Sequence, residues 1–217
     1  MVPQAIRMAK NAFNQYRTRD PEEIIDARKI RLKEYSDPES LLGFFTVMNR
    51  KQIIGINTLA DMVQRKTGLI HELGHSLNDY RAASQGTRFE DTQFFSLSYA
   101  PCEANANLTG ADLCVADEFI LDRIYYEAYG RLVKYINEHI DHFRSERARM
   151  AFEQEQMQEF YDCHSDMPSF EELASELGID AGLVKFKFKA LGYKGYELPN
   201  IPETRGDFLR HWQRNPE

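Results

Sequence analysis

The spacing of apolar and polar positions predicts two helices and a strand in the first part of the chain. Residues 3–17 place apolar side chains at helical intervals. The segment RDPEEIIDAR then offers Asp20 as an N-cap and Pro21 at the first helical position. KIRLKEY alternates apolar and charged residues, which indicates a half-exposed strand.

The clearest β signal is a hairpin. Two β-rich runs, residues 44–48 and 52–57, flank the short polar connection NRK. From Thr58 to about Tyr80 the pattern is helical, and residues 81–100 read as a mixed loop without a clear period. The first half of the chain is therefore expected to combine a small sheet with helices.

The second half of the chain is predicted to be helical. Pro101 leads into one helical segment, and residues 117–161 form a charged helical stretch whose apolar stripe we interpret as a core-packing face. The segment SFEELASELGIDAGLVKFKFKALGYKG predicts a helix, a glycine-containing turn and a second helix, with Ser169 as an N-cap.

Composition narrows the class of protein. A chain of 217 residues with 42% hydrophobic residues is long enough for one packed domain with or without a small appendage. The chain contains no apolar run of about 18 residues, so no membrane span is predicted, and the N-terminus has no apolar signal-peptide core. A net charge of -7 argues against a general nucleic-acid binder. The three cysteines form no CxxC pair, which is typical of free thiols in a cytoplasmic protein, and zinc ligation by them is the lesser alternative.

The segment TGLIHELGHSLN introduces candidate chemistry. Residues four apart share one face of a helix, so His71 and His75 can direct imidazole nitrogens at one ion. Glu72 is rotated by about 100°, which places its carboxylate beside a bound water rather than on the metal. This pattern suits a zinc ion whose water is deprotonated by a general base. Gly74, inside the same helix, suggests close approach by another segment.

A catalytic zinc ion normally has three protein ligands, so a third is required. Glu103, at the start of the second helical segment, is one candidate, although a carboxylate there is also explained by the helix dipole. The histidines outside the motif are further candidates, and each has an ordinary surface explanation: His139, His142, His164 and His211. Spacing alone leaves the third ligand open.

The order of hairpin, HELGH helix and a following helix EANANLTGADLCVAD resembles the ImmA/IrrE family of zinc metallopeptidases, as does the C-terminal ELASELGIDAGLVKFKFKALGYKG. The resemblance covers roughly residues 20–118 and 168–196. Glu103 and Asn107 fit the family pattern, whereas Asn105 and Thr109 replace a usual acid and a usual aromatic residue.

The resemblance implies Zn²⁺ held by His71, His75 and Glu103, with Glu72 as the general base. It also implies a zincin-like α+β fold, mostly helical, with a small antiparallel β-sheet packed on the HExxH helix. The expected division is a metallopeptidase core at residues 1–118, a helical extension at 119–165, and a helix-turn-helix-like segment with a tail at 166–217.

Family members cut, or trigger the loss of, helix-turn-helix repressors of phages, mobile elements or stress regulons. The resemblance therefore implies a cytoplasmic endopeptidase that removes such a repressor and derepresses its genes. The donor for the oxyanion stays open among Tyr80, Tyr99 and His164.

Two alternatives lack catalysis. In the first, the chain is a regulatory protein that binds a repressor without cutting it. In the second, it binds DNA through its C-terminal segment. Lys185, Lys187 and Lys189 alternate with phenylalanines, however, which spreads their charge around a helix instead of forming one basic stripe.

Overall fold

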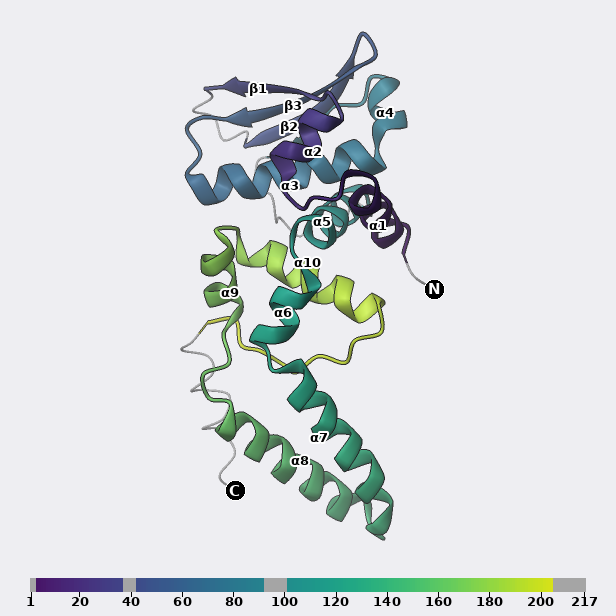
Figure 1. Cartoon of the computed structure of the whole chain (residues 1–217), viewed down its shortest axis with the longest axis vertical. Coiled ribbons are helices and arrows are strands. Elements are labelled where there is room, and N and C mark those ends of the chain that lie inside the picture. Colours follow the sequence, from purple (N-terminus) through teal and green to yellow (C-terminus); the bar gives the residue numbers. More distant parts are fainter. Residues whose placement is uncertain (1–2, 37–41, 92–100, 205–217) are drawn as a thin grey trace. The chain divides into compact units, whose positions relative to one another are not determined.

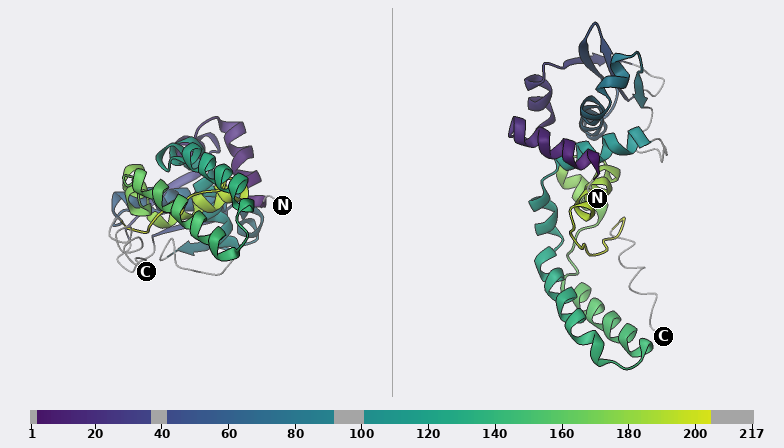
Figure 2. Two further views of the ribbon diagram at one scale, coloured as in Figure 1. Left: turned by 90° about the horizontal axis from the view of Figure 1, so that it is seen from below. Right: turned by 90° about the vertical axis from the view of Figure 1, so that its right-hand side faces the viewer.

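The computed structural model describes residues 3–36, 42–91 and 101–204. The chain forms two compact units, residues 1–116 with 173–196 and residues 117–172 with 197–217. Figures 1 and 2 show the elements from three directions. No described helix is long and apolar enough to cross a membrane.

The first unit contains a mixed sheet and the helices that cover it. In order along the chain, its strands and helices are α1 (Gln4–Tyr16), α2 (Pro21–Ala27), β1 (Arg31–Tyr35), β2 (Gly43–Met48), β3 (Lys51–Asn57), α3 (Met62–Asn78), α4 (Tyr80–Ser84), β4 (Phe89–Asp91), α5 (Pro101–Cys114) and α10 (Ala181–Tyr193).

The sheet has the strand order β1-β3-β2-β4. The predicted hairpin is confirmed, with Asn49 and Arg50 as its two-residue turn and Lys51 already in β3. The α+β class is also confirmed, and the small sheet expected to be antiparallel is mixed, because β1 pairs with β3 in parallel whereas β2 pairs antiparallel with β3 and β4. A hairpin has two free edges, and the alternating pattern of β1 does not specify which edge it joins.

Helix α3 packs on one face of this sheet (Figure 1). Asp61 starts it with a capping box, in which its carboxylate accepts from the Gln64 backbone and the Gln64 side chain accepts from the Asp61 backbone. Leu73 of α3 is fully buried in one cluster with Phe45 and Ile54 of the strands. The helix predicted over residues 58–80 is shorter in the structure, because it begins after the Asp61 cap and ends at Asn78, and the chain continues through Asp79 into α4.

Helix α5 runs against α3, and α1 and α10 pack on α5 in turn. Ala190 and Phe186 of α10 join Ile6 and Leu108 in a small apolar cluster. A buried ion pair also joins α10 to α5. Lys187 Nζ lies 2.9 Å from Asp112 Oδ1, and both side chains are almost inaccessible to solvent. The C-terminal helix thus belongs to the core of this unit.

The second unit is helical. It contains α6 (Asp117–Arg123), α7 (Tyr126–His139), the short 3-10 helix η1 (Ile140–His142) and α8 (Glu146–Cys163), and α9 (Phe170–Leu177) begins in it. Helices α7 and α8 run side by side (Figures 1 and 2). The predicted cap of α9 is confirmed, since Ser169 Oγ accepts from the Glu172 backbone and the Glu172 carboxylate accepts from the Ser169 backbone. The buried hydrophobic cluster of the second unit consists of Phe160, Tyr161 and Met167.

Candidate metal centre

The C-terminal half of α3 directs both histidines of HELGH to one point. The Nε2 atoms of His71 and His75 lie 3.1 Å apart. Both side chains are essentially inaccessible to solvent, at 0% and 1% exposure. Phe89 of β4 stacks on His75 with ring centroids 4.7 Å apart. The i, i+4 spacing therefore produces the convergence expected from the sequence.

Glu103 joins the two histidines from α5. Its Oε2 atom lies 3.2 Å from the Nε2 atoms of both His71 and His75. Ligands about 2.0–2.1 Å from a tetrahedral ion stand about 3.3–3.4 Å from one another. The three donor atoms therefore match the spacing that a zinc ion requires, and the donor set of two imidazoles and one carboxylate fits zinc chemistry.

The close approach of α3 and α5 makes this convergence possible. A Cβ atom on Gly74 would lie 2.1 Å from the carbonyl oxygen of Ala106, and one on Gly110 would lie 2.5 Å from that of Ile70. The sequence-based suggestion that Gly74 marks a close contact is thus confirmed. Glycine at both positions lets the backbones meet and brings the start of α5 to the histidines.

Hydrogen bonds fix the orientation of both imidazoles. The Nδ1 atom of His71 lies 2.8 Å from Asn107 Oδ1, and that of His75 lies 2.8 Å from Asp79 Oδ2. These partners hold a proton on each Nδ1, so in the neutral imidazole the Nε2 lone pair is the one available to a metal ion. Sequence reasoning assigned neither role. Asp79 stands four residues after His75, so helical spacing was an available signal for it, whereas the bond of Asn107 to His71 joins two helices and has no such signal.

Thr109 and Asn78 tie the same helices together. Asn78 Nδ2 donates to Gly74 O and to Thr109 Oγ1, each at 2.8 Å, and Thr109 Oγ1 donates to Ala5 O of α1. The threonine that replaces the family's usual aromatic residue therefore supplies a buried polar link between α3, α5 and α1.

The charges of the cluster are coupled. Burial lowers the pKa of His75, but hydrogen bonds to Asp79 and Glu103 outweigh it, so the pKa is raised. Burial raises the pKa of Glu103, but hydrogen bonds from His71 and His75 outweigh it and hold the pKa well below its usual range. Glu103 is therefore a carboxylate at neutral pH, as a metal ligand must be.

Glu72 is completely buried beside the histidines. The start of β2 lies against it, because a Cβ atom on Gly43 would be 2.9 Å from Glu72 Oε1. The absence of a side chain at Gly43 leaves room for this carboxylate between the sheet and α3.

The remaining sequence candidates have other surroundings. The Nδ1 atoms of His139 and His142 lie near the carbonyl oxygens of Tyr135 and His139. His164 packs against Tyr125 and Phe160 in the second unit. Within the described part of the chain, the group of three possible ligands consists of His71, His75 and Glu103 alone.

Of the candidate oxyanion donors, Tyr80 is half-exposed at 43% in α4. Tyr99 lies outside the described residues, as does the candidate ligand His211. The choice of donor therefore stays as open as the sequence left it.

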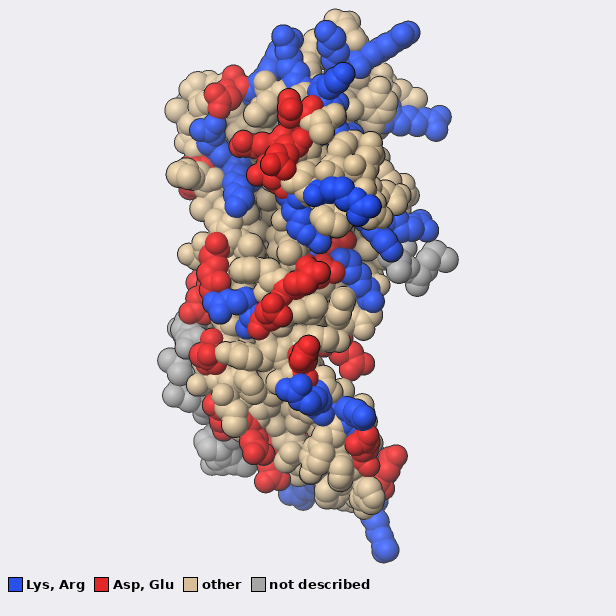
Figure 3. All heavy atoms as spheres, in the orientation of Figure 1, with Lys and Arg blue, Asp and Glu red and all other residues tan. Residues whose placement is uncertain are grey.

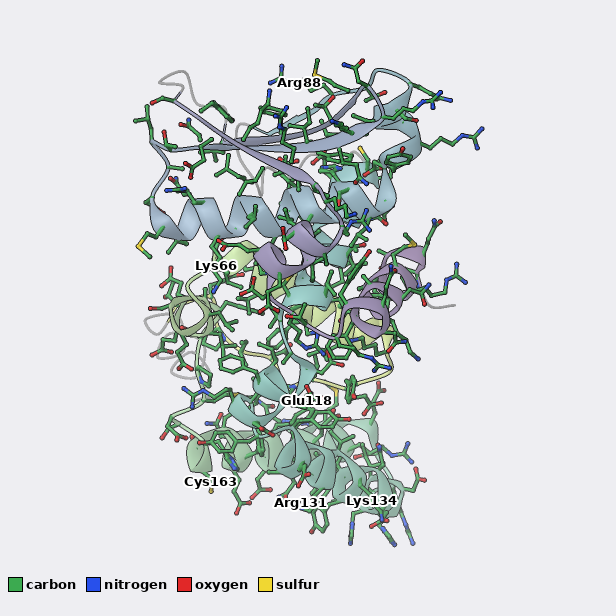
Figure 4. The ribbon with its side chains drawn as sticks, turned by 45° about the horizontal axis from the view of Figure 1, so that its top comes forward. Lys66, Arg88, Glu118, Arg131, Lys134 and Cys163 are labelled. Carbon is green, nitrogen blue, oxygen red and sulfur yellow. The ribbon has the colours of Figure 1, made fainter. Side chains whose placement is uncertain are left out.

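The C-terminal lysines also have distinct environments. Lys187 is buried in its ion pair with Asp112, whereas Lys185 and Lys189 are exposed. Lys66 Nζ of α3 donates to Leu177 O, which ties α3 to the end of α9 (Figure 4). The helices α9 and α10 are thus held by side-chain contacts to the helices that carry the candidate ligands.

An HExxH helix packed on a small sheet, with a carboxylate from a following helix, defines a zincin-like metallopeptidase domain. The chain belongs to the Peptidase M78 family, described as the IrrE N-terminal-like domain, whose model matches residues 25–189. The resemblance to ImmA/IrrE proteins is thereby confirmed, and the match extends through the helical stretch. Comparisons with curated proteins and with solved structures gave no significant match.

Proposed function

We propose that the chain is a zinc-dependent endopeptidase. The convergence of two imidazole Nε2 atoms and the Glu103 carboxylate, each 3.1–3.2 Å from the others, is the observation that carries this proposal. Membership of a peptidase family supports it. Asn107 and Asp79 orient the imidazoles, which reduces the reorganisation needed to bind an ion.

Glu72 is the proposed general base. Zinc, when bound, lowers the pKa of a water molecule and polarises a carbonyl group. The Glu72 carboxylate accepts the proton of the attacking water and delivers it to the amine that leaves. Its complete burial between α3 and β2 excludes bulk water from this transfer and strengthens its electrostatic interaction with the reacting groups.

A helix-turn-helix repressor of the phage or mobile-element type is the proposed substrate. This part of the proposal rests on the likeness to ImmA/IrrE proteins, and the residues of the centre do not select a sequence. Cleavage would remove the repressor and derepress its genes.

Two substitutions separate metal binding from catalysis. Glu72→Gln should retain zinc and lower peptide cleavage by at least about 10²-fold, because an amide cannot accept the proton. Glu103→Ala should lose zinc as well as activity, since only two protein ligands remain. Zinc content by mass spectrometry and cleavage of the helix-turn-helix protein encoded beside this gene measure the two effects.

Most activity surviving in Glu72→Gln would remove Glu72 from the mechanism, and unchanged zinc stoichiometry in Glu103→Ala would remove it from the ligand set. Stable binding of the repressor by the wild-type protein without cleavage would favour a regulatory binding protein instead.

A further inference from the structure

A basic hollow of about 520 Å³ lies at one end of the sheet in the first unit. Lys and Arg side chains gather at this end, where the β2–β3 hairpin turns (Figure 3). Its lining includes Gln52 and no acidic side chain. The five cations that line it are Arg28, Lys29, Arg31, Arg50 and Lys51. Such a concentration is unexpected in a chain of net charge -7.

The parallel pairing of β1 with β3 brings these cations together. In that register Arg31 pairs with Ile53, so the first residues of both strands lie at the same end of the sheet. Arg28 and Lys29 immediately precede β1, and Arg50 and Lys51 lie where the hairpin enters β3. Two short basic segments far apart in the sequence are therefore neighbours.

The charges of the basic hollow are not balanced by neighbouring carboxylates of the described residues. Among the described residues, none of the five is within 4.0 Å of a carboxylate oxygen. Arg28 is held in place, because its Nη2 donates to Gln52 Oε1 and to Ser76 O. Its buried Nε has no hydrogen-bond partner in the described structure. An anion in the hollow would offset the repulsion between these charges and the incomplete bonding of this guanidinium.

Two of the five cations take left-handed backbone conformations. Lys29 and Arg50 have φ angles of 57° and 62°, in the left-handed region that glycine and asparagine tolerate best. Arg50 adopts this conformation in the two-residue hairpin turn, whose central residues both take positive φ, and Lys29 adopts it directly after the end of α2. These two side chains are thus placed by a turn and by a helix end, where asparagine is also well accommodated.

We propose that the basic hollow binds an oligophosphate, either inorganic or as the phosphate chain of a nucleotide. Guanidinium groups match phosphate oxygens with paired hydrogen bonds, and five cations around one hollow require several negative charges in a short span. The volume suits a small ligand. The charges are gathered in one place instead of along a stripe, and no aromatic side chain lines the hollow, which disfavours a nucleic-acid strand.

Calorimetric titration of the full chain with inorganic tripolyphosphate tests this site. The variant Lys29→Asn, Arg31→Gln, Arg50→Asn, Lys51→Gln keeps Arg28, which bonds to Ser76, and places asparagine at both left-handed positions. We expect saturable binding by the wild type that weakens with added salt, and an affinity at least about tenfold lower in the variant.

A control removes the same number of exposed charges from the second unit: Arg131→Gln, Lys134→Gln, Arg144→Gln and Arg147→Gln, of which Arg131 and Lys134 are seen in Figure 4. It should bind as the wild type does. If the first variant fails to fold, Arg31→Gln with Lys51→Gln alone tests the same site at ordinary strand positions.

Absence of saturable wild-type binding, or equal losses in both variants, would overturn the proposal. So would binding of an oligothymidylate by a protein that does not bind tripolyphosphate. Adenosine triphosphate distinguishes the two sources: equal affinity indicates that only the phosphate chain is recognised, and tighter binding indicates a nucleotide.

Discussion

The helix pair α3 and α5 of the first unit and the helix pair α7 and α8 of the second unit differ in how deeply their side chains are buried. Residues 67–76 of α3 and 106–113 of α5 are buried without interruption, so these helices are enclosed on all sides. In the second unit, α7 buries only Ile136, and α8 buries Phe160 and Tyr161. Both pairs contain histidine and glycine, yet only the enclosed pair brings a carboxylate, that of Glu103, to two histidines of the facing helix. Close packing, more than the presence of ligand residues on helices, therefore creates the candidate centre.

Glycine substitutions should show the largest difference between the pairs. Gly74→Ala places a Cβ atom 2.1 Å from the Ala106 carbonyl oxygen, and a backbone atom cannot rotate away. We expect a loss of about 3 kcal/mol or more in unfolding free energy, together with weaker zinc binding because α5 carries Glu103. Gly130→Ala in α7 meets nothing within 4 Å and should gain up to about 1 kcal/mol from helix propensity.

Denaturant titrations measure both variants, and hydrogen exchange reports on each helix pair separately. Equal stability of Gly74→Ala and the wild type would show that the two helices separate readily and would remove the distinction between the pairs.

Charge substitutions should give a smaller difference of the same kind. Lys187→Met removes the inaccessible partner of the buried Asp112 carboxylate, which keeps its ion pair with the partly exposed Lys194, and should destabilise the first unit by about 3 kcal/mol. Lys134→Met removes an exposed pair with Glu138, whose N–O distance is 3.8 Å, and should change stability by less than about 1 kcal/mol.

Adding Asp112→Asn to Lys187→Met should restore part of the loss, because it removes a buried charge that would otherwise be paired with Lys194 alone. A double variant as unstable as the single one would show that Lys187 contributes by packing its hydrocarbon chain instead.

Local features of this fold were predictable from the sequence. Asp20 caps α2 by accepting from the backbones of Glu22 and Glu23, and HELGH presents its histidines on one face, since each depends on residues within one turn. The hairpin was predictable for the same reason. Non-local choices were not: the partner of β1 and the burial of Lys187 against Asp112 depend on which surfaces meet, and residue spacing does not encode this.

The candidate site likewise has a part that the sequence predicts locally and a part that depends on packing between helices. The two histidines belong to one helix, so spacing sufficed for them. Glu103 stands on a separate helix, and spacing alone left it as one of several candidates, of which it is the one among the described residues that lies beside both histidines. Its place beside the histidines depends on the glycine contacts between α3 and α5.

The smallest expected effect concerns the hydrogen bond behind His75. Asp79→Asn keeps an acceptor of the same shape at 2.8 Å from Nδ1 but removes its charge, so zinc affinity should fall about 10–100-fold, as is usual for such partners. His139→Gln in α7 is the matched change, because the Nδ1 atom of His139 lies near a carbonyl of its own helix. Competition with a chelating dye measures both affinities. Equal affinities of wild type and Asp79→Asn would mean that enclosure between α3 and α5 alone orients His75, whereas weaker zinc binding in His139→Gln would make the loosely packed pair a second metal-binding region.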